Sequence, residues 1–227
     1  SIYDSNITVE NGKTIHDGAT PNVSASTNLI NQGYILGVNN GRTLTNKGTI
    51  TLNSTSTATP LKTLVAIGTD GKAIPTSSKA VNEGSVTSKI NDEIGIYVGN
   101  GAVGTNNSTG TIAMDGIKAF GMVGSKADTE NKGNITINGV SSIGMYSIET
   151  SASPLHKVAK NTGTITTTGN NNIAMVGNYS NILNDTTGII RLNNSTNNVG
   201  MYTSAGTSGA ITNNGTIDMG GTENIVW

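Results

Sequence analysis

The chain has 227 residues, and its 13 Lys and Arg nearly balance its 14 Asp and Glu, so the formal net charge is −1. This balance gives no basic surface for nucleic acid, and no apolar run is long enough to insert directly into a membrane. The chain has no cysteine, which excludes disulfides, thiolate metal sites and a cysteine nucleophile. Thirty glycines and a charged fraction of only 12% disfavour helices and favour strands joined by tight turns.

A short unit, Asn-x-Gly-Thr-Ile or a near variant, recurs along the chain. Clear copies begin at Asn46, Asn82, Asn131, Asn161 and Asn213, and looser copies lie at 31–35, around Gly110 and around Gly188. A second unit, Ile-Gly-Met-Tyr or a variant, follows each later copy. The two units keep an 11-residue spacing from glycine to glycine (alanine once), as in Gly84–Gly95, Gly110–Gly121, Gly133–Gly144 and Gly163–Ala174, and a 12-residue spacing in Gly188–Gly200. The returns vary from 12 to 19 residues. A constant segment with a variable return is typical of a solenoid.

Both units alternate like strands with one buried face. In the first unit, apolar residues stand two and four positions after the glycine, as Ile135 and Ile137 do after Gly133. In the second unit, the residues on either side of the glycine, such as Ile143 and Met145, are predicted to point inward. The asparagine two residues before each first glycine is predicted to stack in a hydrogen-bonded ladder at a corner, formed by Asn31, Asn46, Asn82, Asn131, Asn161 and Asn213.

The repeats predict an all-β fold, a parallel β-helix of about eight coils over residues 29–227. Residues 1–28 are expected to form an N-terminal flanking segment or a partial coil, and the C-terminus falls inside a repeat, as in a truncated solenoid. A β-sandwich is the rival fold, but it does not explain the constant spacing. The same register predicts three opposite-charge pairs on neighbouring coils: Lys89 with Asp115, Asp92 with Lys118, and Arg191 with Asp218.

Chemistry-bearing motifs are sparse. The two histidines, His16 and His156, have no partner at metal-ligand spacing, and Gly99–Gly104 matches a dinucleotide fingerprint without the helix that would bind phosphate. The closest carboxylates are Asp92 with Glu93 and Asp128 with Glu130, and no two carboxylates occupy equivalent positions of adjacent coils. We therefore expect no catalytic, metal or cofactor site, and we expect the chain not to be an enzyme.

Two features are candidates for ligand binding. Tyr97, Tyr146 and Tyr202 follow the second glycine by two residues and should form an outward stripe along the rod, with Val123 and Val176 between them, beside a track of glycines. Such tyrosines stack on sugar rings or anchor a protein partner. The alternative is that they only cover exposed glycine backbone, or that a return loop lies over them. The long return 147–157 adds Glu149, His156 and Lys157, because loops carry function more often than strands do.

The repeats Ala-x-Asn-x-Gly-Thr-Ile and Ile-Gly-Met-Tyr, in a cysteine-free and Asn/Thr/Gly-rich chain, resemble passenger regions of type V autotransporters, most closely those of the large fusobacterial outer-membrane adhesins. This resemblance implies a right-handed β-helix displayed at the cell surface. It also implies attachment to host cells or other bacteria through glycan or protein receptors. Two alternatives stay open: a structural spacer rod, and a polysaccharide-active β-helix enzyme.

Overall fold

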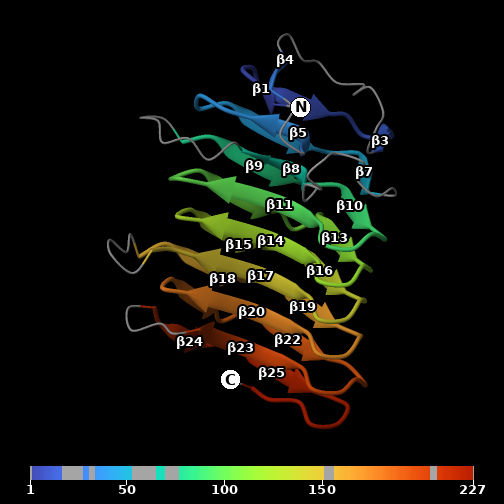
Figure 1. The fold of residues 1–227 in the computed structure, drawn as a ribbon, viewed down its shortest axis with the longest axis vertical. Helices are drawn as coiled ribbons and strands as arrows, with labels where there is room; N and C mark the ends of the chain where they lie inside the picture. Colours follow the sequence, from blue (N-terminus) through green and yellow to red (C-terminus); the bar gives the residue numbers. More distant parts are fainter. Residues whose placement is uncertain are drawn as a thin grey trace.

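In the computed structural model, successive strands wind around a common axis and stack into a rod, as Figure 1 shows. The structure describes residues 2–16, 28–30, 34–52, 65–69, 77–150, 156–204 and 209–226. Each turn of the chain contributes one strand to each of three sheets, and the sheets meet at three corners. Among the described residues, no helix is long and apolar enough to cross a membrane.

Within the described residues, the three sheets, here named A, B and C, contain nine, eight and eight strands. Sheet A contains β4 (Asn28–Ile30), β1 (Ile2–Tyr3), β5 (Tyr34–Val38), β8 (Val65–Thr69), β11 (Ile94–Gly99), β14 (Phe120–Ser125), β17 (Ile143–Ile148), β20 (Ile173–Asn178) and β23 (Val199–Ser204). Sheet B contains β2 (Ile7–Val9), β6 (Thr43–Asn46), β9 (Lys79–Asn82), β12 (Val103–Asn106), β15 (Asp128–Asn131), β18 (Val158–Asn161), β21 (Asn181–Asn184) and β24 (Ile211–Asn213). Sheet C contains β3 (Thr14–His16), β7 (Thr49–Leu52), β10 (Ser85–Ser88), β13 (Thr111–Met114), β16 (Asn134–Ile137), β19 (Thr164–Thr167), β22 (Ile189–Leu192) and β25 (Thr216–Met219).

The fold is a right-handed parallel β-helix, as predicted. All strand pairs are parallel except β1 with β4. The turns from β11 to β25 make five turns of regular build, and a count of about eight is reached only with the N-terminal turns. Those turns are less regular, since β1 has 2 residues and β2 and β3 have 3 each. The predicted boundary between residues 28 and 29 stays a prediction, because residues 17–27 lie outside the described part of the chain.

The core is a set of apolar columns, one residue per turn. Ile135 and Ile137 of sheet C point inward, as predicted, and expose none of their surface. A methionine column fills the sheet A side of the core, where Met122, Met145, Met175 and Met201 are register partners. Methionine suits this position because its unbranched side chain adapts to neighbours of different shape.

One part of the predicted core is wrong. The residue before the second glycine, such as Ile143, is half-buried on the outer face of sheet A, and the glycine itself is buried. A Cβ atom on Gly144 would lie 2.6 Å from the carbonyl oxygen of Ala174 and 2.8 Å from the Cγ2 atom of Ile165. The glycine therefore takes an inward position next to the core, and two consecutive residues face in. Strict alternation would place Ile143 on the same face as Met145, whereas the two consecutive inward residues place Ile143 on the outer face.

The predicted asparagine ladder runs through sheet B at its corner with sheet C. Each amide nitrogen donates to the amide oxygen of the next turn at 2.8–2.9 Å, from Asn46 through Asn82, Asn106, Asn131, Asn161 and Asn184 to Asn213. Asn106 and Asn184 were not predicted, because each stands four residues before its glycine instead of two. Asn31 lies outside the described residues.

A second polar column, at the corner between sheets C and A, was not predicted from the sequence. The side-chain oxygen of each turn accepts a backbone N–H bond from the preceding turn, at 2.8–3.0 Å, in the column Ser142, Asn172, Asn198 and Asn224. These residues stand two positions before the second glycine or its equivalent. The two corners therefore use side-chain amides in different ways.

The remaining register predictions have mixed outcomes. Arg191 and Asp218 are direct partners. The backbone N–H of Asp92 donates to the carbonyl oxygen of Ile117, the residue before Lys118. The backbone N–H of Asp115 donates to the carbonyl oxygen of Ser88, the residue before Lys89. All three charge pairs thus lie on adjacent turns, as predicted. The looser copy at 31–35 was misassigned, because Tyr34 and Ile35 belong to β5 of sheet A.

Candidate functional site

The outer face of sheet A is apolar and aromatic. Two outward columns follow the solenoid axis, and both are at least partly accessible in most turns. The first contains Ile94, Phe120, Ile143, Ile173 and Val199, and the second contains Tyr97, Val123, Tyr146, Val176 and Tyr202. Four of the six tyrosines and the only phenylalanine lie on this face when Tyr34 of β5 is included. Such a concentration of aromatic side chains is unusual for a chain with 4% aromatic residues.

The tyrosine column has the register that the sequence predicted. Tyr97, Val123, Tyr146, Val176 and Tyr202 are partners in successive strands. Tyr202 exposes 46% of its surface, whereas Val123 and Val176, each between two tyrosines, expose 8% and 4%. The valines therefore fill the gaps between the rings. The expected surface track of glycines is absent from this part of the structure, since Gly95, Gly121, Gly144 and Gly200 are buried.

Edge-to-face contacts between aromatic rings hold two of these tyrosines. The rings of Tyr97 and Tyr34 are 6.4 Å apart, and those of Tyr146 and Phe120 are 5.9 Å apart. Tyr34 itself has a structural role, because its ring lies over Gly68 and its hydroxyl donates to the carbonyl oxygen of Thr69 at 2.9 Å. Tyr34, which was not among the predicted tyrosines, thus covers glycine backbone in the way that the alternative proposed for Tyr97, Tyr146 and Tyr202.

Charged residues flank this outer face but do not lie in its strands, since Lys118 and Lys126 stand just outside the two ends of β14. Within the strands that the structure describes, sheet A contains no Asp, Glu, Lys or Arg. A third outward column beside the tyrosines is mixed: it contains the polar Ser125, Asn178 and Ser204, with the apolar Ile148 between Ser125 and Asn178. The face therefore offers apolar rings next to neutral hydrogen-bonding groups.

The predicted loop residues meet at the base of the return that follows β17. Glu149 is buried, and its carboxylate accepts a bond from the Lys157 backbone N–H at 3.0 Å, which closes the loop. His156 is exposed, with a positive φ of 57°, and its carbonyl oxygen accepts from the Asn181 amide at 3.3 Å. The Glu149 carboxylate thus has a structural partner, and ligand binding by Glu149, His156 and Lys157 stays a prediction. Residues 151–155 lie outside the described chain.

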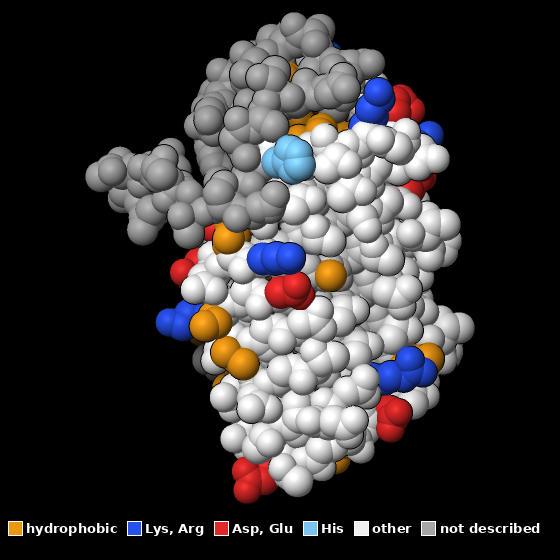
Figure 2. Space-filling model, turned by 90° about the vertical axis from the view of Figure 1, so that its right-hand side faces the viewer, with side chains coloured by type: hydrophobic (Ala, Val, Ile, Leu, Met, Phe, Trp, Pro, Cys, Tyr) orange, Lys and Arg blue, Asp and Glu red, His pale blue; other side chains and the backbone are white. Residues whose placement is uncertain are grey.

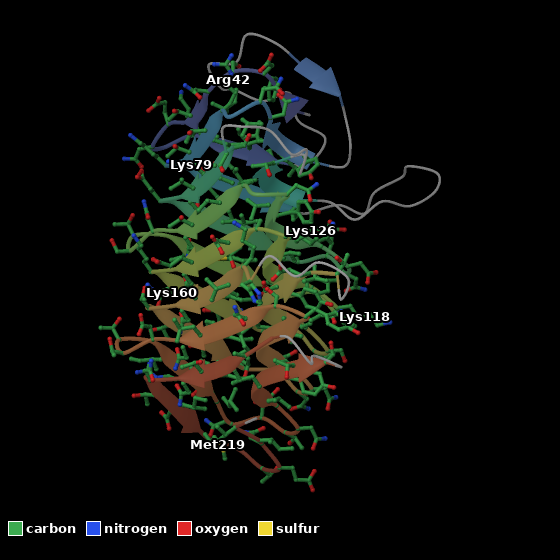
Figure 3. All side chains as sticks on the ribbon, turned by 90° about the vertical axis from the view of Figure 1, so that its left-hand side faces the viewer. Arg42, Lys79, Lys118, Lys126, Lys160 and Met219 are labelled. Carbon is green, nitrogen blue, oxygen red and sulfur yellow. The ribbon has the colours of Figure 1, made fainter. Side chains whose placement is uncertain are left out.

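Sheet B carries a network of charges that the sequence reading missed. The Lys160 ammonium lies 3.8 Å from the Glu130 carboxylate and 3.6 Å from that of Asp185. Lys132 and Lys157 add pairs to Glu130 and Asp128, at 3.7 Å and 4.0 Å. Figure 3 places Lys160 along the same side of the solenoid as Arg42 and Lys79. The signal was present, because Glu130 and Lys160 both stand three residues before their first glycine.

Sheet C presents mainly hydroxyl groups. Its outward columns include Thr49, Thr51, Ser85, Thr87, Thr111, Thr136, Thr164 and Thr166. Figure 2, which views the side of the molecule at the right of Figure 1, is mostly white, with few charged or hydrophobic side chains. The three faces of the solenoid therefore differ in chemistry. In the described ranges, no group of three or more His, Cys, Asp or Glu could hold a metal ion.

One protein family, described as the BigA third pectate lyase-like domain, matches residues 3–226. The chain belongs to this family. BigA-type domains belong to bacterial surface proteins, which agrees with the broad class expected from the autotransporter resemblance. No curated protein and no solved structure matches the chain.

The family corrects the expectation that the chain is not an enzyme. That expectation depended on finding no carboxylates on equivalent positions of neighbouring coils, and it is wrong as a conclusion, because the family is pectate lyase-like. The structure shows that carboxylates can share a face without occupying equivalent positions of neighbouring coils. Asp128 and Glu130 are two residues apart in β15, so both side chains lie on its outer face. Lysines of the next turn lie beside them. Carboxylates two residues apart on one strand lie on the same face without being in equivalent positions of neighbouring turns.

Proposed function

We propose that this chain is a segment of a cell-surface adhesin, displayed outside the cell as an autotransporter-type passenger. It attaches the bacterium to host cells or to other bacteria through glycan or protein receptors. The family, a domain of bacterial surface proteins, supports the location. The observation that carries the attachment role is the uncharged aromatic outer face of sheet A, with Tyr97, Tyr146 and Tyr202 in one column.

The physical argument is that such a face gains free energy when it is covered. Exposed tyrosines combine a large apolar area with a polar hydroxyl and few rotatable bonds, so they are frequent anchors in recognition surfaces. Sheets B and C are weaker candidates. The charges of sheet B already pair with one another, and the hydroxyls of sheet C are strongly hydrated.

A cell-attachment assay tests this function. Purified, labelled chain is incubated with epithelial cells and with bacteria, and bound label is measured. The triple variant Tyr97→Ala, Tyr146→Ala, Tyr202→Ala should lose most attachment. The matched control changes outward residues of sheet C, as Thr87→Ala, Thr136→Ala and Thr166→Ala, and should attach like the parent chain. Circular dichroism and thermal unfolding check that both variants fold. Equal attachment by the tyrosine variant and the parent chain would exclude this face as the attachment surface, and no attachment by the parent chain would leave it as a spacer rod.

A second candidate function, a polysaccharide-active enzyme, is favoured by the pectate lyase-like family and by the Asp128, Glu130, Lys157 and Lys160 side chains on one face of sheet B. The test is incubation with acidic polysaccharides and measurement of newly formed chain ends. Activity that disappears in Glu130→Gln and Lys160→Met, and persists in the triple tyrosine variant, would establish this function. The absence of new chain ends over a panel of acidic polysaccharides would remove it.

A further inference from the structure

We propose that the tyrosine column of sheet A binds one extended chain of neutral β-1,4-linked hexopyranose sugars, laid along the solenoid axis. This inference rests on the proposed attachment function and names the receptor chemistry of the same face. It is carried by three observations: the period of the rings, the contacts that hold two of them, and the absence of charge from the strands of this face.

The period of the rings matches such a chain. Tyr97, Tyr146 and Tyr202 recur at every second turn, which places neighbouring rings roughly 9–10 Å apart at the usual strand spacing. A ribbon-like β-1,4-linked chain is twofold, so every second sugar presents the same ring face, over a similar length. Each tyrosine can therefore stack on equivalent sugars of one straight chain. A globular protein partner would not require this regular period.

The surface between the tyrosines is filled, and two of the rings are held in place. Val123 and Val176 lie between them in the column and expose only 8% and 4% of their surface, so the tyrosine rings are the accessible part of this apolar column. The contacts with Tyr34 and Phe120 restrict the rings of Tyr97 and Tyr146 before any ligand binds. Preorganised rings lose little conformational freedom on binding, which favours a ligand that offers only weak contacts per sugar.

The polar groups beside the rings select a neutral sugar. Ser125, Asn178 and Ser204 stand two residues after the tyrosine column, in one column with the apolar Ile148, and offer neutral hydrogen-bonding groups beside the rings. The described strands of sheet A carry no Lys or Arg that could neutralise a uronate or sialate carboxylate. Burying an unpaired carboxylate against this face would be costly. An acidic polysaccharide therefore does not fit this face.

Titration calorimetry with purified oligosaccharides tests the proposal. Cello- and chito-oligosaccharides of increasing length are titrated into the full chain. Affinity should rise with length until the oligomer spans Tyr97 to Tyr202, a distance of roughly 19 Å at the strand spacing, or about five sugars. Oligogalacturonates of the same length should bind at least tenfold more weakly. Affinity that does not depend on length, or stronger binding of the galacturonates, would overturn the proposal.

The central ring provides the sharpest variants. Tyr146→Ala should weaken binding of the longest oligomer about tenfold, because it removes the middle ring of the column. Tyr146→Phe should bind like the parent chain, since stacking does not need the hydroxyl. Thr136→Ala, on the outer face of sheet C, is the control and should change nothing. Equal binding by Tyr146→Ala and the parent chain would also contradict the proposal.

The two levels of inference can fail separately. Loss of cell attachment in the triple tyrosine variant, together with no binding of neutral oligosaccharides, would keep the attachment function and replace the glycan by a protein receptor. Unchanged attachment in that variant, with oligosaccharide binding that depends on Tyr146, would keep the glycan site and remove its role in attachment.

Discussion

At the scale of single residues, the Asn-x-Gly motif joins two constraints at one corner. The asparagine side chain reaches the next turn, as Asn131 does by donating to Asn161 at 2.9 Å. The glycine lets the backbones of two turns approach, because a Cβ atom on Gly133 would lie 2.3 Å from the carbonyl oxygen of Gly110. Neither function depends on a ligand, so the most regular part of the sequence is structural.

The ladder predicts that an interior asparagine matters more than the last one. Asn131→Ala leaves the Asn161 oxygen without its ladder donor in a fully buried corner, and should lower the free energy of unfolding by about 2–4 kcal/mol. Asn213→Ala, at the half-exposed end of the described ladder, should cost about 1 kcal/mol or less. Urea unfolding followed by circular dichroism measures both. Similar costs for the two variants would contradict a cooperative buried ladder.

The glycines of the first unit form one column and those of the second unit form another, and the two columns should respond differently to substitution by alanine, which adds a methyl group. The second column already contains Ala174, which shows that a turn can accommodate a Cβ atom there, whereas the first column is glycine in every turn from Gly48 to Gly215. Gly133→Ala should therefore destabilise by about 1–3 kcal/mol, and Gly144→Ala by less. Thermal unfolding measures the stability of the two variants, and a greater loss of stability in Gly144→Ala than in Gly133→Ala would refute this ranking.

Much of this residue-scale pattern was readable from the sequence, because each column keeps a fixed distance from a glycine. Asn106 and Asn184 were missed since their turns contain two additional residues before the glycine. The column of Asn172, Asn198 and Asn224 was visible in the sequence but was not aligned. Long-range contacts between aromatic rings, such as Phe120 with Tyr146, could not be predicted from alternation that had placed Phe120 inside the core.

At the scale of elements, three sheets with similar inner faces have unlike outer faces. The inner positions are fixed by packing against the adjacent turns, so they repeat. The outer positions are free of this constraint, and their chemistry differs between the sheets: aromatic and apolar on A, mainly hydroxyl groups on C, and on B a local group of charges at Asp128, Glu130 and Lys160 among mostly uncharged side chains. The sequence reading identified the aromatic face but not the charges of sheet B, because it compared only a few of the equivalent positions.

The group of charges on sheet B should contribute little to stability, and its contribution should depend on salt. Lys160 is partly exposed and pairs with Glu130 and Asp185. Lys160→Met should therefore lower stability by about 0.2–1 kcal/mol per lost pair at low ionic strength. The difference from the parent chain should shrink at roughly 1 M salt, where screening is strong. Urea unfolding at the two salt concentrations gives the comparison, and a large, salt-independent loss would indicate a packing role for the lysine stem.

At the scale of the whole molecule, each turn contacts mainly its two neighbours, so stability should be close to a sum over turns. Removal of residues 134–163 joins Gly133 to Thr164, so that Thr164 takes the place of its register partner Asn134, and deletes β16, β17 and β18. The shortened chain should fold with a lower melting temperature, and small-angle scattering should show a rod shorter by roughly 4.8 Å.

The control for this deletion removes residues 134–162 instead. It leaves one additional residue, which shifts the following strand by one position and exchanges its inner and outer side chains. This variant should unfold or aggregate. Similar folding of both deletions would show that the turns do not depend on register.

The location of the candidate functional site was only partly predictable at this scale. The sequence predicted the outward tyrosines because their distance from the second glycine is constant. It did not predict that Glu149 closes a loop, since the bond to the Lys157 N–H depends on how the return folds back. Loops that break the period carry no register from which such contacts can be derived.

The two longer corner turns have a practical consequence. At Asn106–Gly110 and Asn184–Gly188 the ladder continues through Asn106 and Asn184 although each turn holds two additional residues. The ladder therefore depends on the position of the asparagine amide at the corner and not on the number of residues between the asparagine and the glycine. These turns are therefore natural positions for grafting: an epitope tag or a cross-linking residue placed between Asn107 and Thr109 would project from the rod while the stack of turns continues beneath it.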